Sequence, residues 1–172
     1  MATAPIVDHP DLGPEHFPVS VVLESRPPVH SQWVDEVWSA VGVVVGSRDD
    51  GQSGELQLVS DAGGVKRYLS TGLQVALYTD QCESYYHNMM TETPRCYVVA
   101  HLDDEETDGR PEPFLVSMSF DEAHAYLEGD DEIYGVDVPP ELYRWTEAFV
   151  LAHYFPEKKR KRKLKNWKEG EQ

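Results

Sequence analysis

The sequence lacks several features that define common functional classes. No stretch reaches the roughly 18 apolar residues of a membrane-spanning helix, and residues 1–18 have neither the basic nor the apolar region of a signal peptide. The chain of 172 residues has only two cysteines, Cys82 and Cys96, which form no CxxC pair. We therefore expect a cytoplasmic protein with free thiols and no bound metal or other cofactor.

Catalytic motifs are missing as well. There is no GxSxG or HExxH sequence, and the seven histidines are scattered. His87 and His101 leave one alternative, a Cys/His metal site assembled across adjacent strands with the two cysteines. The carboxylates at 103–106 and 128–132 are typical of solvated loops. We identify no catalytic residue, and the sequence favours a protein that is not an enzyme.

The chain has few adjacent glycines. One pair, Gly63-Gly64, is followed three positions later by Arg67 and so resembles a phosphate-binding loop. Such a loop follows a strand and opens a helix, where backbone N–H groups meet the phosphate. The residues that follow, 65–78, instead alternate between apolar and polar side chains. We therefore predict that the glycine pair is a turn joining two strands.

Basic residues are scarce in most of the chain. Residues 1–157 contain 7 basic and 29 acidic residues, a net charge of −22, whereas residues 158–172 contain 8 basic and 2 acidic residues, a net charge of +6. An acidic body followed by a basic segment indicates an interaction that depends on charge.

Short alternating segments separated by turn residues predict strands. The fold class we expect is α+β, mainly an antiparallel meander that forms a barrel or sandwich of about 6–8 strands. A bulge is expected near Ser39-Ala40. The predicted strands lie within 17–26, 31–46, 55–60, 65–70, 73–79, 84–91, 95–103 and 113–120.

Two helices are expected after the strands. Residues 119–131 fit a short helix with Ser119 as N-cap and Glu122 three positions later. Residues 138–156 fit a longer amphipathic helix that starts at a proline pair and stops at Pro156. We divide the chain into a flexible arm (1–16), a single globular domain (17–156) and a basic tail (157–172) that we expect to be disordered.

Two segments are candidates for binding a partner. Tyr85, Tyr86 and Met89 would place large side chains on both faces of a strand, so that they are either buried or form an exposed patch. The basic tail suits an acidic protein, the acidic body of a second copy of this chain, nucleic acid or an anionic membrane, although the acidic body would repel nucleic acid. A merely solubilising tail is the alternative. Its candidate residues are Lys158, Lys159, Arg160, Lys161, Arg162 and Lys163.

The chain also resembles a known family over residues 17–163. The resemblance rests on "FPVSVVLESRP", on Trp33 and Trp38 with "GVVVG", on "YLSTGLQVALYTDQCESYYHNM", on "PFLVSMSFDEAHAYLEGDD", and on "VPPELYRWTEAFVLAHY" followed by "PEKKRKR". This bacterial family of unknown function is typically encoded beside molybdenum formate dehydrogenase operons, and its members are often labelled molybdopterin-guanine dinucleotide biosynthesis protein A. The true transferase is an α/β protein with its nucleotide loop at the N-terminus, which this sequence does not match.

The resemblance implies an association with formate dehydrogenase. We expect a non-catalytic accessory protein that supports maturation or assembly of this enzyme through contact with one of its subunits, an associated ferredoxin or a maturation protein. The alternative is an enzyme or carrier in molybdenum-cofactor biosynthesis that binds a pterin or nucleotide. In that case Arg67 and Arg95 are the candidate anion contacts, because basic residues are so few in the body.

Overall fold

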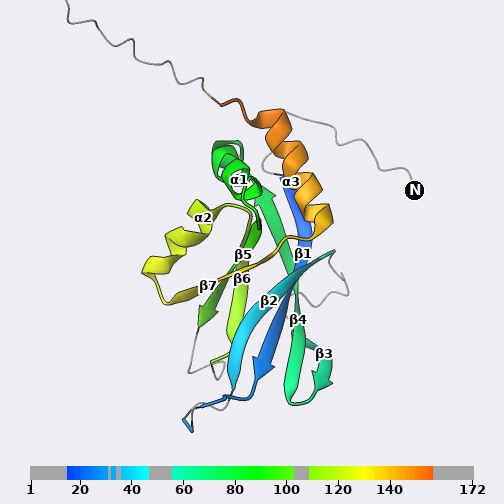
Figure 1. The fold of residues 1–172 in the computed structure, drawn as a ribbon, viewed down its shortest axis with the longest axis vertical. Coiled ribbons are helices and arrows are strands. Elements are labelled where there is room, and N and C mark those ends of the chain that lie inside the picture. Colours follow the sequence, from blue (N-terminus) through cyan, green and yellow to red (C-terminus); the bar gives the residue numbers. More distant parts are fainter. Residues whose placement is uncertain (1–14, 31, 34–35, 47–55, 103–108, 157–172) are drawn as a thin grey trace, which may run out of the picture.

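A computed structural model of the chain describes residues 15–30, 32–33, 36–46, 56–102 and 109–156. The predicted arm and tail lie outside these residues, apart from Glu15 and His16, which belong to the first strand. Within them are seven strands, of which the first four precede any helix, and helical segments that follow β4, β6 and β7 (Figure 1). The strands are β1 (Glu15–Arg26), β2 (Val37–Val45), β3 (Leu56–Ala62), β4 (Val65–Leu77), β5 (Arg95–Leu102), β6 (Pro111–Ser117) and β7 (Asp131–Asp137).

The seven strands form a single sheet in the order β2-β1-β4-β6-β5-β7, with β3 also paired to β4. Every pairing is antiparallel except that of β4 with β6. Because β2 and β7, the ends of this order, come close to each other, the sheet is nearly closed into a barrel. The predicted α+β class and mainly antiparallel architecture are confirmed.

Bulges and glycines shape the sheet. The β1–β2 register passes from Val22↔Gly42 to Leu23↔Ala40, so the expected bulge exists and Val41 is the extra residue. Gly63 and Gly64, with φ of +65° and +82°, turn β3 into β4 as predicted. The prediction of two strands separated at Thr71-Gly72 was wrong, because β4 runs unbroken from 65 to 77.

The helical segments comprise three α-helices and two 3-10 turns in the described residues. They are η1 (Thr79–Gln81), α1 (Cys82–Met89), α2 (Phe120–His124), η2 (Ala125–Glu128) and α3 (Pro140–His153). The predicted C-terminal helix is confirmed. In α2, Ser119 is the N-cap, and its Oγ accepts a hydrogen bond from the Glu122 N–H at 3.1 Å.

Two further segments differ from their predictions in the kind of element they form. The segment around 84–91 is the helix α1 and not a strand, because Cys82, Tyr85 and Met89 recur at intervals of three and four and so share one face toward the core. Strand β7 was missed because its acidic residues and Gly135 hide the alternation.

The main core lies inside the barrel and beneath α1 and α3. β1 contributes Val19, Val21 and Leu23, all fully buried. At the helix-covered end the centroids of the Phe17 and Trp145 rings lie 5.0 Å apart, and this contact joins β1 to α3. The other buried members include Val75, Leu77, Val98, Val116, Tyr85, Met118, Leu142 and Phe149.

A smaller layer lies outside the barrel, where α2 packs on β5 and β6. Val99 and Ala123 are fully buried but do not belong to the main core. The Tyr97 ring meets the Phe120 ring edge to face, with centroids 5.7 Å apart. Among the described residues, no helix has the length and apolar composition to cross a bilayer.

Candidate functional site

Tyr85, Tyr86 and Met89, the predicted partner-binding residues of this segment, all lie on α1 but differ in how far they are buried. The Tyr85 side chain is fully buried, and its hydroxyl accepts a hydrogen bond from the Tyr78 N–H at 3.0 Å. Burial raises the pKa of this phenol above its ordinary value. Met89 is partly buried against the core, whereas Tyr86 is 37% exposed. Of the three residues, Tyr86 is therefore the one best placed to contact a partner.

Tyr86 belongs to a group of large exposed side chains from two helices that are distant in the sequence. Its ring lies 5.0 Å from that of Tyr154, just beyond the end of α3. Three residues at the ends of the same two helices are strongly exposed: Met90 (67%) follows α1, Leu151 (75%) is in the last turn of α3, and Phe155 (81%) follows Tyr154 in the chain. We call Tyr86, Met90, Leu151, Tyr154 and Phe155 the helix-end surface. Figure 1 shows α1 and α3 side by side at this end of the barrel.

The predicted basic candidates, Lys158–Lys163, follow the helix-end surface in the sequence. They lie outside the described residues. The structure does show where the chain leads into them, because α3 ends at His153 and the described residues continue to Pro156. The polypeptide therefore leads from the exposed aromatic residues directly into the basic segment.

Arg67 and Arg95, the predicted anion contacts, each bind a carboxylate of the protein itself. Arg67 Nε lies 3.0 Å from Glu24 Oε2, and Arg95 Nη1 lies 3.0 Å from Asp137 Oδ1. The two arginines stand on different strands, β4 and β5, and the structure does not bring them together in one site.

Glu24, on β1, is a buried carboxylate that is not among the candidate residues predicted from the sequence. Its side chain is only 3% exposed and is held by both Arg26 and Arg67. The hydrogen bond from Arg26, together with Arg67, lowers the pKa of this carboxyl although burial acts in the opposite direction. The cluster joins β1 to β4 and leaves no acid or base ready for chemistry.

The histidines and cysteines do not assemble a metal site in the part of the chain that the structure describes, where no group of three or more potential ligands gathers. His101 Nδ1 lies 3.0 Å from Asp131 Oδ1, and His87 pairs with Glu83 along α1. Cys82 and Cys96 are buried free thiols, and burial raises the pKa of Cys96 to about 12. Such thiols are poor nucleophiles at neutral pH.

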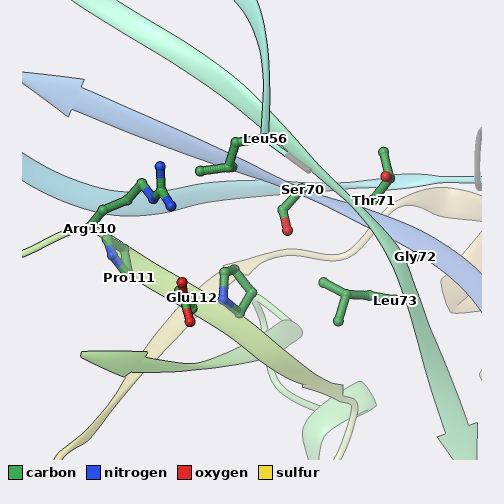
Figure 2. A pocket seen from close by; sticks show the side chains of 9 residues that line it. Leu56, Ser70, Thr71, Gly72, Leu73, Arg110, Pro111 and Glu112 are labelled. Atoms are coloured by element: carbon green, nitrogen blue, oxygen red, sulfur yellow. The ribbon is translucent and has the colours of Figure 1, made fainter. Parts of the chain in front are cut away.

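A cleft of about 370 Å³ opens between β4 and β6 (Figure 2). It lies where β4 changes neighbours, because Ser70 pairs with Leu56 of β3 and Val75 pairs with Val116 of β6. No local sequence pattern indicates this cleft. We call it the β4–β6 cleft, and it is lined by Leu56, Ser70, Thr71, Gly72, Leu73, Arg110, Pro111, Glu112 and Pro113.

The architecture defines the class of protein as an α+β fold with a nearly closed, mainly antiparallel barrel. Comparison of the sequence with family models then identifies the family. The chain belongs to a family described as a protein of unknown function (DUF3305), whose model matches residues 18–163. No functionally curated protein and no solved structure matches the chain.

Proposed function

We propose that this protein is a non-catalytic accessory protein that supports maturation or assembly of a molybdenum-dependent formate dehydrogenase through protein–protein contact. The link to that enzyme comes from the family resemblance, whose members are typically encoded beside its operons and often labelled as molybdopterin-guanine dinucleotide biosynthesis proteins. The observation that carries a contact function is the helix-end surface, with Leu151 and Phe155 more than 70% exposed.

The composition of this surface supports a role in binding. Tyrosine, phenylalanine and methionine are enriched in protein–protein interfaces. Tyr86 and Tyr154 support each other through their ring contact, so they present a preformed platform that loses little conformational freedom on binding. Large exposed apolar side chains that gather in one place mark interaction sites more often than single ones do.

The basic segment supplies an electrostatic contribution. It follows the helix-end surface in the chain and carries a net charge of +6 over residues 158–172. Complementary charge speeds the encounter with an acidic partner more than it strengthens the final complex. The partner we propose is a formate dehydrogenase subunit or an associated ferredoxin or maturation protein that has an acidic surface.

The test is capture from the native host grown on formate, with an N-terminal tag and analysis by mass spectrometry, followed by binding of the purified partner. Recovery of formate dehydrogenase subunits or their ferredoxin supports the proposal. Tyr86→Ala combined with Leu151→Ala should weaken binding at least tenfold. The matched control is Leu58→Ala, because Leu58 is also an exposed leucine (55%) but lies on β3.

Deletion of 158–172 should slow association, most strongly at low salt, where charges are least screened. If the protein is recovered alone and purified formate dehydrogenase fails to bind it, the proposal is overturned. If binding is retained by the Tyr86/Leu151 variant, the contact does not use the helix-end surface.

A further inference from the structure

The negative charge of the body is concentrated in its helix-bearing part. Residues 118–156, which form α2, η2, β7 and α3, contain nine acidic residues and one basic residue, a net charge of −8. The described residues of β1 to β4 and their flanks (15–30, 36–46 and 56–77) contain four acidic and three basic residues, a net charge of −1. A positively charged segment is therefore attracted more strongly to the helices than to the hairpin end.

The outer face of α2 and η2 combines this negative charge with exposed aromatic side chains. Phe120 and Tyr126 are both exposed, and Asp121 beside Phe120 is exposed as well. The ring of Phe114, on β6, meets the Tyr126 ring edge to face, with centroids 5.4 Å apart. We call Phe114, Phe120, Asp121, Tyr126 and Leu127 the α2 surface.

The basic segment of the same chain complements this surface in charge and in side-chain type. Residues 158–168 contain eight lysines and arginines and no acidic residue, together with Leu164 and Trp167. Lysine and arginine bind over the faces of aromatic rings, and their aliphatic stems cover apolar surface. The exposed Leu58 and Val59 of β3 offer no such match, because residues 56–77 contain one acidic and two basic residues.

The segment begins close enough to reach the α2 surface. Tyr154, just after α3, contacts Tyr86 of α1, and Ser84 Oγ of α1 lies 2.9 Å from Oγ of Ser119, the N-cap of α2. α1 therefore lies between α3 and α2 (Figure 1). Packed helices lie about 8–10 Å apart, so the path across α1 is about 20 Å, whereas eleven extended residues span about 36 Å.

Glu83 adds a carboxylate along this path. It precedes Tyr86 by three positions in α1, which places both residues on the same side of the helix, and its side chain is strongly exposed. Attachment to the same chain also gives the segment an effective concentration in the millimolar range. The body of its own molecule is therefore a stronger competitor for the segment than a second copy at micromolar concentration.

We propose that residues 158–168 dock on the α2 surface of their own molecule. The segment crosses α1 past Glu83, and its lysines and arginines pair with Asp121 and cover the exposed rings of Phe120 and Tyr126. An acidic partner then has to displace the segment from the body. Its apparent affinity falls in proportion to the fraction of molecules in which the segment is free.

The experiment places a nitroxide spin label on the segment in the full chain through Leu164→Cys. Cys82 and Cys96 are buried, so the label reacts at the introduced thiol. The amide NMR signals of residues 119–127 should broaden at about 0.05 M salt and recover at about 1 M salt, where the Debye length falls to about 3 Å. The signals of β3 should stay sharp under both conditions.

Variants of the labelled chain test the charged contacts. Asp121→Asn combined with Glu83→Gln removes two exposed carboxylates, which should shift the ratio of docked to free segment about fivefold toward the free form. Loss of broadening at the amide of Phe120 measures this shift. Asp61→Asn is the matched control, because Asp61 is also an exposed aspartate but lies on β3, and it should leave the broadening unchanged.

Several outcomes would overturn the proposal. They are sharp signals for residues 119–127 at low salt, broadening that persists at high salt, equal broadening of β3, or an equal effect of Asp61→Asn. Broadening in an isotope-labelled chain without a spin label, mixed with the spin-labelled chain, would assign the contact to a second copy and also overturn it.

If the double variant fails to fold, the salt comparison on the labelled chain with Asp121 and Glu83 intact decides the question. None of these measurements involves formate dehydrogenase. Docking of the segment and the proposed accessory function therefore fail separately.

Discussion

At the helix-covered end of the barrel the buried Asn88 side chain is neutral, whereas near the β3–β4 hairpin the buried Glu24 side chain is charged. The Asn88 amide on α1 donates to the carbonyls of Arg95 and Met118 at 2.7 and 3.0 Å and accepts from the Arg95 N–H at 3.0 Å. Near the hairpin, Glu24 is held by Arg26 and Arg67. Each arrangement joins elements that are distant in the sequence.

The Asn88 hydrogen bonds and the Glu24 ion pairs differ in how they respond to pH and salt. The amide network depends on geometry alone, because asparagine does not titrate and its partners are backbone groups of fixed position. The ionic cluster depends on pH and on salt, since the two arginines are 52% and 60% exposed and their charges are screened. The helix-covered end should therefore keep its stability at low pH or high salt, where the hairpin end becomes less stable.

The largest expected effect is at the helix-covered end. Asn88→Ala removes the partner of the buried Met118 carbonyl and of the partly buried Arg95 carbonyl and N–H, which should lower the free energy of unfolding by about 3 kcal/mol. Urea denaturation at pH 7 measures it. His87→Ala, at an exposed position on the same helix, is the control and should cost less than 1 kcal/mol. A loss below 1 kcal/mol for Asn88→Ala would contradict the assigned role of the network.

An intermediate effect is expected at the hairpin end. Glu24→Gln should lower the free energy of unfolding by about 1 kcal/mol at pH 7. Because the folded pKa of Glu24 is lowered, its stabilisation is fully present above the unfolded value near 4.3 and disappears as the pH falls through the folded value. Denaturation curves between pH 7 and pH 3 should therefore converge for the two proteins at the acid end.

The control for this experiment is Asp137→Asn, which breaks the pair with Arg95. Asp137 has 89% of its side chain exposed, so its loss should change stability by less than about 0.5 kcal/mol. Equal effects of the two substitutions, or a Glu24 effect that persists unchanged at pH 3, would show that burial of Glu24 has no special electrostatic consequence.

The smallest expected effect on stability is at the helix-end surface. Tyr86→Ala removes the ring contacts with Tyr154 and with the exposed His87 and should cost about 0.5 kcal/mol. Thermal unfolding of this variant should nearly overlay that of the unmodified protein. A loss of several kcal/mol would mean that Tyr86 is a structural residue like its buried neighbour Tyr85, and would remove it from the proposed contact surface.

Local signals predicted much of the fold. Alternation in 17–26 predicted β1, the glycine pair predicted the β3–β4 turn, and the proline pair at 139–140 predicted the start of α3. The error at 84–91 arose because Tyr85 and Tyr86 favour strands locally, while the placement of Cys82 and Tyr85 in the core favours a helix. Tertiary packing overrode the propensity at that point.

The candidate sites were less predictable, because each combines residues that are distant in the chain. Tyr86 was a candidate from the sequence, but its contact with Tyr154 depends on how α1 packs against α3. Arg67 was a candidate as an anion contact, but the register of β1 against β4 places it on Glu24. The β4–β6 cleft is lined by Gly72 and by Pro111 and Pro113, which lie 39 and 41 positions further along the chain.

The sequence by itself determined the local choices, which are where strands alternate, where turns fall, where α3 begins, and that an acidic body precedes a basic segment. Only the tertiary structure decided which side chains are exposed and which strands separate. The physical reason is that turn, cap and periodicity preferences act between neighbouring residues, whereas burial, ion pairing and strand register depend on groups brought together by folding.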